Sequence, residues 1–264
     1  MCVVFFIKNH RHYPLYVFLF RHALELLPQI EMNSCIDQPY AVCLVKRSMK
    51  AHWWTQYPHV LAGIDTGFKL PYSQKLNFNE TVTVYSNQEH DHGTWIAISI
   101  NGRYGFLTNY REPSNQIDPN ALSRGNLVRD FVLGSQSPLE YIHFVKDSAK
   151  KYNGFNLVVG EVYGQSFFYG NRGNQDITEI LDNIVYGLSN GTLISPWPKV
   201  EFGKRIFGNE IDNHPDPKEL QNKLLQLLQN TTDFDELPPE MFDYELEKRL
   251  APICIDKERI PTGT

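Results

Sequence analysis

The sequence predicts an α+β domain in which helices cover two β-sheets. Residues 93–110 show two apolar strands joined by a tight turn. Residues 125–151 carry apolar side chains at helical spacing, and strand patterns return at 155–169 before helical patterns resume at 198. Strands followed by helices, and then both again, are typical of an α+β fold whose helices pack on its sheets.

The strands at 93–110 predict a sheet with two buried faces. Asn101-Gly102 between them favours a two-residue type I′ turn, because both residues tolerate positive φ angles. Side chains alternate along a strand. One face of the first strand carries Ile96, Ile98 and Ile100, and the other carries Trp95, Ala97 and Ser99. Neither face has a polar stripe for solvent, so we expect both to be covered.

Other elements follow from the same patterns. Residues 3–7 form an apolar strand, and residues 8–50 are irregular, with a helix at 21–30 and a strand at 40–45. Further on we expect a strand at 59–62, a helix that ends before Gly134, a helix at 138–151, a hairpin of 155–162 with 165–169, a strand at 185–189, and helices at 198–211 and 217–229. The tail at 233–264 is rich in proline and acid, and we expect part of it to be mobile.

Composition limits the class of protein. At 264 residues, of which 42% are hydrophobic and 21% charged, the chain fits one globular domain spanning 1–264. The net charge of -5 argues against a nucleic-acid partner. Its four cysteines lack metal-binding or disulfide spacing, which predicts neither a zinc site nor a disulfide framework and favours a reducing compartment. We also expect no metal and no cofactor. No apolar run is long enough to span a membrane, which favours a soluble protein.

Cys2 is the candidate nucleophile. If Met1 is removed, Cys2 carries both a thiol and the free α-amino group of the chain. The amine, with an ordinary pKa of about 7.7–8.0, can take the proton of a thiol whose pKa is about 8.5. One residue then supplies both nucleophile and base. The alternative is that Cys2 is a small apolar residue at the start of a buried strand.

Two asparagines follow apolar strands in similar contexts, Leu-Thr-Asn at Asn109 and Leu-Ser-Asn at Asn190. Side-chain amides at neighbouring strand ends can donate hydrogen bonds to a tetrahedral oxyanion. Both are therefore candidate catalytic residues alongside Cys2. Asparagine also ends strands by capping the turn that follows, which is the alternative.

Arg172 and Trp95 are candidate ligand-binding residues. Arg172 lies at a hairpin end, in Tyr-Gly-Asn-Arg-Gly, where its forked guanidinium can hold a carboxylate or a phosphate. Trp95 offers a flat ring for a planar ligand such as haem. A solvated turn arginine and a tryptophan of the core are the alternatives.

Several motifs occur together along the chain. They are the start Met-Cys-Val-Val-Phe-Phe, His52-Trp53-Trp54, Val60-Leu61-Ala62-Gly63-Ile64-Asp65, Gly93-Thr94-Trp95, Leu107-Thr108-Asn109-Tyr110, Ser123-Arg124-Gly125, Tyr152-Asn153-Gly154-Phe155-Asn156-Leu157, Tyr169-Gly170-Asn171-Arg172-Gly173 and Tyr186-Gly187-Leu188-Ser189-Asn190. In this order they resemble the transport and Golgi organisation protein 2 family. The resemblance implies a four-layer αββα sandwich like that of N-terminal nucleophile hydrolases, with Cys2 in the nucleophile position. It also implies a cytoplasmic protein associated with Golgi and mitochondria, acting in secretory organisation, lipid homeostasis and haem mobilisation.

The chain departs from that family in two places. Family members carry an Asn-Arg-Asp-Glu motif at the end of the second strand, and nothing in the divergent segment 8–50 matches it. In related cysteine hydrolases an Arg and an Asp there orient the nucleophile, so their loss argues against hydrolysis. The chain also stops at Gly263-Thr264, where members continue into final strands, so we expect a sheet that is incomplete at the carboxyl end.

The sequence therefore predicts a protein of intracellular trafficking and Golgi organisation that holds a hydrophobic ligand, haem or an acyl-lipid, on a hydrolase-like scaffold. The alternative is an amidohydrolase in which Cys2 attacks an amide while Asn109 and Asn190 stabilise the oxyanion. A third class, a Golgi-associated interaction protein, has no local signature. Whether the protein is an enzyme stays open on the sequence alone.

Overall fold

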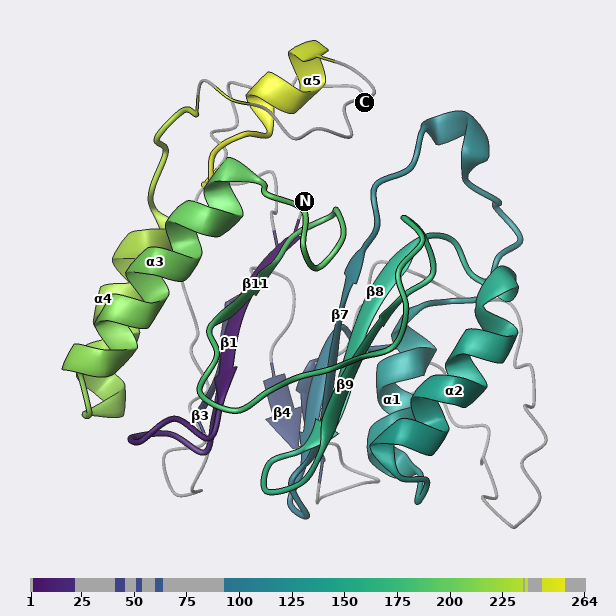
Figure 1. Cartoon of the computed structure of the whole chain (residues 1–264), viewed down its shortest axis with the longest axis horizontal. Helices are drawn as coiled ribbons and strands as arrows, with labels where there is room; N and C mark the ends of the chain where they lie inside the picture. The colour runs from purple at the N-terminus through teal and green to yellow at the C-terminus, as the bar shows by residue number, and fades with distance from the viewer. Residues whose placement is uncertain are drawn as a thin grey trace.

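The chain folds into two β-sheets with helices on their outer sides (Figure 1). The strands form a four-stranded sheet, sheet A, and a seven-stranded sheet, sheet B. The mixed class of helix and sheet predicted from the sequence is confirmed. The computed structural model describes residues 2–21, 41–45, 51–53, 60–63, 93–234, 236 and 244–254.

Sheet A has the strand order β11-β1-β2-β3, so the amino-terminal strand lies inside the sheet. Neighbouring strands are antiparallel except β2 and β3, which are parallel. The strands predicted at 3–7, 40–45 and 185–189 are confirmed. Sheet A is built from β1 (Cys2–Lys8), β2 (Leu15–Arg21), β3 (Ala41–Val45) and β11 (Tyr186–Leu188).

Strand β2 corrects the sequence analysis, which treated 8–50 as irregular. Leu15, Tyr16 and Val17 are consecutive and all buried, because both faces of the strand are covered. A strand buried on both sides lacks the alternation that identifies strands in a sequence. The helix predicted at 21–30 begins on Arg21, the last residue of β2, and the rest of it lies outside the described residues.

Sheet B is antiparallel throughout, in the order β10-β9-β8-β7-β6-β5-β4. The hairpins predicted at 93–110 and 155–169 form its centre, and the strand predicted at 59–62 is β5. Its strands are β4 (Ala51–Trp53), β5 (Val60–Gly63), β6 (Ile96–Ser99), β7 (Arg103–Asn109), β8 (Phe155–Glu161), β9 (Ser166–Gly170) and β10 (Thr178–Glu179).

The turn between β6 and β7 differs from the predicted type I′ turn. Ile98 pairs with Tyr104, which leaves a longer loop than two residues, and in this loop only Gly102 has a positive φ, of 80°. The Gly102 amide donates to the Ser99 carbonyl at 2.9 Å, and the Gly102 carbonyl accepts from Val162. The neighbouring β8–β9 turn therefore holds the loop in this longer form, and Ile100 is exposed rather than buried.

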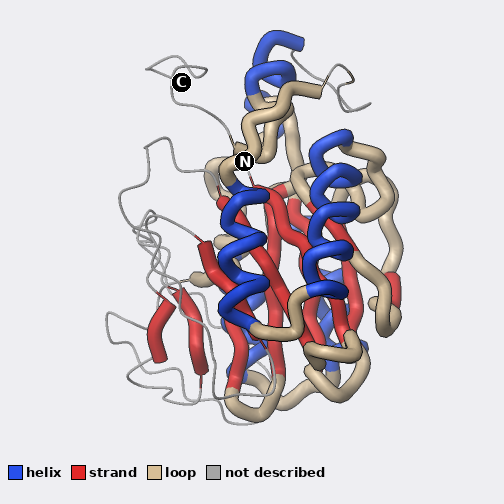
Figure 2. The backbone as a smooth tube through the Cα atoms, turned by 90° about the vertical axis from the view of Figure 1, so that its left-hand side faces the viewer, coloured by secondary structure: helices blue, strands red, loops and turns tan. Residues whose placement is uncertain are grey.

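Helices cover the outer face of each sheet. Helices α1 and α2 lie against sheet B, while α3 and α4 lie against sheet A (Figures 1 and 2). The helices predicted before Gly134 and at 138–151, 198–211 and 217–229 are confirmed, the second of them ending in a 3-10 turn. The helices are α1 (Gly125–Leu133), α2 (Pro138–Ser148), α3 (Pro198–Asn213), α4 (Pro217–Leu228) and α5 (Tyr244–Arg249), with 3-10 turns at Ser114–Gln116 and Ala149–Lys151.

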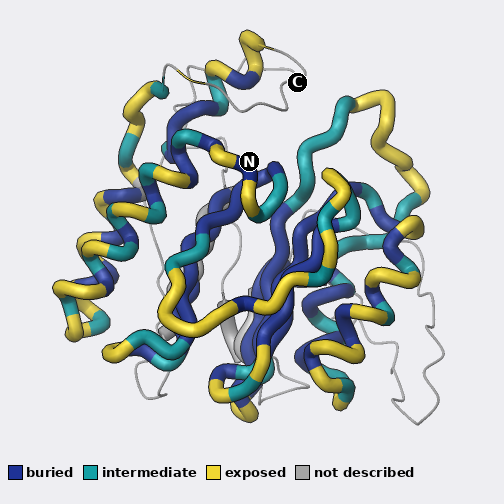
Figure 3. The backbone as a smooth tube through the Cα atoms, in the orientation of Figure 1, coloured by how far each residue is buried: buried dark blue, intermediate teal, exposed yellow. Residues whose placement is uncertain are grey.

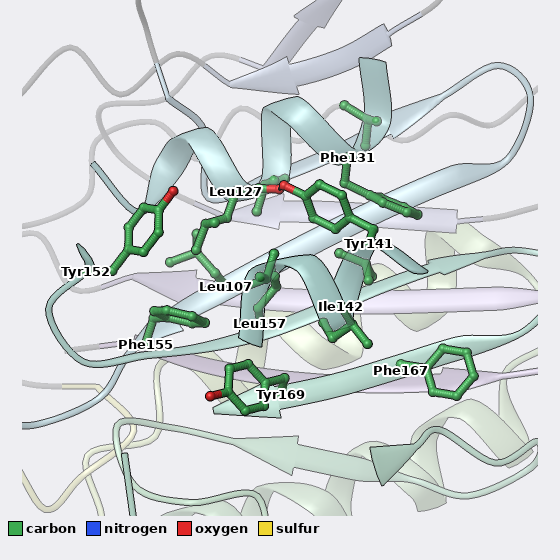
Figure 4. Close-up of a cluster of buried hydrophobic side chains, with 14 of the residues drawn as sticks. Leu107, Leu127, Phe131, Tyr141, Ile142, Tyr152, Phe155, Leu157, Phe167 and Tyr169 are labelled. Carbon is green, nitrogen blue, oxygen red and sulfur yellow. The ribbon is translucent and has the colours of Figure 1, made fainter. Parts of the chain in front are cut away.

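Three buried clusters fill the spaces between these layers, so the central strands whose burial is described, β1, β7, β8 and β9 among them, are covered on both faces (Figure 3). One lies between α3, α4 and sheet A, and a second between the sheets. The third joins α1 and α2 to sheet B, where Phe131 and Tyr141 from the helices meet Leu107 and Tyr169 from the strands (Figure 4). Ile96 and Ile98 lie in the cluster between the sheets, whereas Trp95 and Ala97 lie under the helices, as the alternation predicts.

Candidate functional site

The structure brings Asn109 and Asn190 together. Asn109 is the last residue of β7 in sheet B, and Asn190 follows β11 in sheet A. The Asn190 side-chain amide donates to the main-chain carbonyl of Asn109 at 2.7 Å, and the Arg111 amide donates to the Asn190 carbonyl at 2.7 Å. The two sheets are therefore bonded to each other at this end, which is the upper end in Figure 1.

A pocket of about 270 Å³ lies beside this junction. Its wall combines asparagine amides, arginine and glutamate side chains, and two aliphatic side chains. Among the described residues Asn109 Oδ1 is a buried acceptor that lacks a hydrogen-bond partner. The pocket is lined by Asn109, Tyr110, Arg111, Glu112, Ile117, Arg124, Asn153, Asn190 and Leu250.

A buried polar network supports the Asn190 segment from below. Asn156 on β8 is fully buried, and its amide donates to the Gly191 carbonyl at 2.8 Å and to Thr108 Oγ1 at 3.3 Å. Its side-chain oxygen accepts from Gln175 Nε2 at 3.1 Å. Thr108 in turn donates to the Ser189 carbonyl at 2.7 Å. Sheet B thus holds the main chain on both sides of Asn190.

Arg172 binds a carboxylate that belongs to the protein itself. Its Nε lies 2.7 Å from Glu112 Oε1, and the Glu112 side chain lines the pocket. Glu112 also accepts from the main-chain amide of Gly154. The guanidinium of Arg172 is therefore occupied by Glu112, and in the described part of the chain Arg172 does not line the pocket, so its role in ligand binding stays a prediction.

Two of the sequence motifs meet at the start of α1. The backbones of Gly93 and Gly125 approach so closely that a Cβ on Gly125 would lie 2.8 Å from Gly93 Cα. The Thr94 amide donates to the Gly125 carbonyl at 3.1 Å. This contact fixes the neighbouring Arg124, which lines the pocket and whose guanidinium donates to the Gly154 carbonyl at 2.9 Å.

The residue that follows helix α5 closes one side of the pocket. Leu250, directly after the helix, lines the pocket, and its carbonyl accepts from the buried Lys199 at 2.8 Å. Glu247 of the helix forms an ion pair with Arg111, with 2.9 Å between Oε1 and Nε.

Among the helices that the structure describes, α5 included, none is long and apolar enough to cross a membrane.

Cys2 begins β1 at the same end of sheet A, and its main chain pairs with Arg21. The register that pairs Val4 with Leu188 brings Cys2 level with Asn190 when it is continued by two residues. Trp95 lies near this end of sheet B, since its carbonyl accepts from the Leu107 amide at 2.8 Å, but its side chain is on the other face, buried in the cluster under α1 and α2.

The remaining chemistry near the pocket is limited. Burial, with a contribution from Asp130, raises the pKa of Tyr152 to about 12, so this phenol next to Asn153 stays protonated at neutral pH and is no base. In the described part of the chain, no three His, Cys, Asp or Glu side chains gather where they could hold a metal ion.

Sequence reasoning missed Asn156, Glu112 and Glu247. An asparagine inside an apolar strand pattern could have indicated a buried polar network, because buried amides have hydrogen-bond partners. In the structure Asn156 is fully buried. Glu112 and Glu247 gave no such signal, since their partners Arg172 and Arg111 are distant in the sequence.

Fold and pocket together define a two-sheet α+β protein with a partly polar site at its strand ends. The sequence model of the family described as Transport and Golgi organisation 2 matches residues 1–263. The chain belongs to this family.

Similar proteins carry the family name. The chain is 34% identical over 259 residues to the Transport and Golgi organization 2 homolog of Mus musculus, covering 96% of this chain and 80% of that protein. It is 37% identical over 236 residues to the Transport and Golgi organization protein 2 homolog of Homo sapiens, covering 87% of this chain and 72% of that protein. Among solved structures, penicillin V acylase from Agrobacterium tumefaciens is similar with a TM-score of 0.40 and 11% identity, covering 85% of this chain and 70% of that chain.

Proposed function

We propose that this protein acts in transport and Golgi organisation, as its relatives' names say, by holding a hydrophobic ligand, haem or an acyl-lipid, in the strand-end pocket of a hydrolase-like scaffold. The observation that carries the proposal is the pocket of about 270 Å³, in which Ile117 and Leu250 share a wall with amides and charges. The order of helices, sheet, sheet and helices supports an αββα scaffold of the N-terminal nucleophile hydrolase type. The proposal includes a cytoplasmic location with peripheral association with Golgi and mitochondria.

The size and lining of the pocket favour one mode of binding. Sites that enclose a whole small molecule usually span about 300–1,000 Å³. A pocket slightly below that range encloses the polar end of such a ligand, where asparagine amides and arginine side chains can bind it. The apolar remainder then extends across Ile117, whose side chain is 51% exposed.

Replacing Ile117 with aspartate is expected to weaken binding of palmitoyl-CoA or haem at least tenfold. Losing the burial of one isoleucine side chain removes about 1.5–3 kcal/mol, and about 1.4 kcal/mol corresponds to a factor of ten in affinity. Calorimetric titration for palmitoyl-CoA and absorbance titration for haem measure the effect. Ile194→Asp is the matched control, because Ile194 is 88% exposed and absent from the pocket wall. Equal losses in both variants, or no saturable binding of either compound to the unmodified protein, would refute the proposal.

A second candidate function is an amidohydrolase with Cys2 as nucleophile. It is favoured by the strand register, which brings Cys2 level with Asn190. In this mechanism the α-amine takes the thiol proton, the thiolate attacks an amide carbonyl, and the amides of Asn109 and Asn190 donate to the oxyanion. One N–H of Asn190 already bonds the Asn109 carbonyl, so its second N–H is the one offered to substrate.

Intact-mass measurement of the purified protein tests this mechanism first. We expect a mass that lacks Met1, since only then does Cys2 carry the free amine. Release of the acyl group from an N-acyl amide should then be lost in Cys2→Ala and retained in a Cys254→Ala control, because Cys254 is absent from the pocket wall in the described part of the chain. A mature chain that keeps Met1 excludes the mechanism.

A further inference from the structure

Helix α5 is held to the domain in an unusual way. It has six residues, and its buried residue is the acidic Glu247, which is 2% exposed, while Tyr244 and Leu246 face solvent. Short surface helices are normally held by an apolar stripe, because a helix of this length is unstable by itself in water. In α5 a carboxylate occupies the position that an apolar side chain would normally take.

The partner of this carboxylate is part of the pocket. Glu247 pairs with Arg111, which lines the pocket and whose main chain is fixed by its bond to Asn190. Burying both charges costs several kcal/mol of desolvation, which their attraction roughly offsets. Such a pair adds little net stability, yet it makes the position of α5 depend on what occupies Arg111.

We propose that Glu247 is an internal carboxylate that competes with the ligand for Arg111, so that a carboxylate-bearing ligand in the pocket displaces Glu247 and releases α5. The inference rests on the proposed ligand-binding function. It adds that the group recognised is a carboxylate, and that the pocket opens when α5 is released. An arginine fork can bind a carboxylate in a defined planar geometry. Glu247 shows that a carboxylate oxygen can lie within ion-pair distance of the Arg111 guanidinium. Exchanging one carboxylate for another leaves no buried charge unpaired.

The lining of the pocket agrees with this exchange. Arg111 and Arg124 both contribute to the wall, where Glu112 is already paired with Arg172. A ligand carboxylate that replaces Glu247 therefore keeps the charge balance of the site. Leu250 lines the same pocket and directly follows α5, so release of the helix also loosens an apolar part of the wall, while Lys199 still holds the Leu250 carbonyl.

Hydrogen exchange of the ligand-free protein tests the anchor. In Glu247→Gln the amides of α5 and Leu250 are expected to exchange at least about tenfold faster, because a neutral amide pairs less well with Arg111. Exchange in β7 and α4 should stay unchanged. Glu245→Gln is the matched control, since Glu245 is exposed on the same helix. Unchanged exchange in α5, or faster exchange throughout the domain, would overturn the proposed role of Glu247.

Competition is measured with two probes of matched size, hexanoate and hexanol. Hexanoate is expected to bind Glu247→Gln about tenfold more tightly than the unmodified protein, because the internal competitor is weakened, whereas hexanol binds both equally. In the unmodified protein hexanoate, but not hexanol, should speed exchange in α5. Equal hexanoate affinity in both proteins overturns the inference while the Ile117→Asp result still supports the pocket. Binding of neither probe to either protein counts against the pocket and the inference together.

Discussion

Replacing Gly203 with alanine is expected to lower the free energy of unfolding by about 3 kcal/mol, the upper end of the usual cost of overpacking a core. Gly203 lies on the face of α3 that packs against β1, and a Cβ there would lie 2.0 Å from Phe5 Cζ. Phe5 cannot move aside easily, because it is fully buried and its ring stacks on Phe207 at 6.1 Å. Urea denaturation measures the change.

Gly208→Ala in the same helix is the control for this prediction. A Cβ at Gly208 would meet only Val185 Cγ2, at 3.3 Å. Alanine favours a helix over glycine by about 0.8–1.0 kcal/mol, so this variant should be unchanged or slightly more stable. If both variants lost the same stability, close packing of α3 on β1 would not be the cause.

The second large effect is expected for Asn156→Leu, which should also cost about 3 kcal/mol. Leucine has the same branching and number of side-chain heavy atoms as asparagine, but it leaves the Gly191 carbonyl and one N–H of the Gln175 amide without their partner, and each buried unpaired group costs about 1–3 kcal/mol. The segment that carries Asn190 is then held less firmly. We therefore expect weaker palmitoyl-CoA binding by the protein that remains folded, in addition to the lower stability.

Two comparisons separate the causes. Asn213→Leu makes the same replacement at an exposed position whose side chain bonds only Asn209, so a change below about 0.5 kcal/mol is expected there. Asn156→Asp keeps an oxygen that can accept from Gln175 but loses the donor to Gly191. A stability of Asn156→Leu equal to that of Asn213→Leu would show that the network does not stabilise the fold.

The parts of the fold that the sequence predicted are those with local signals. Ile96 and Ile98 alternate with Trp95 and Ala97, and these two sets do lie on opposite faces of sheet B. The helices on 125–133 and 138–148 have regular apolar spacing, and the second begins with a capping box at Ser137. Strand β2 has no such periodicity, because its consecutive residues are buried alike.

The residues of the candidate site could be predicted only where a local sequence pattern indicates them. Asn109 and Asn190 were identified from their positions after apolar strands, and the structure joins them through a hydrogen bond. The pairing of Arg172 with Glu112 depends on which loops the sheets bring together, so no local pattern indicates it. The contact of Glu247 with Arg111 likewise requires the three-dimensional path of the chain.

The hydrogen bonds from Thr108 to Ser189 and from Asn156 to Gly191 lie at one end of the interface between the two sheets. The cluster that fills this interface is apolar. Contacts among hydrocarbon groups have no preferred direction, so they would tolerate one sheet sliding across the other by a fraction of a residue. Directional bonds are satisfied at a single alignment only. This small group of polar atoms therefore fixes the fine alignment of the two sheets. The same alignment determines the shape of the pocket at their strand ends.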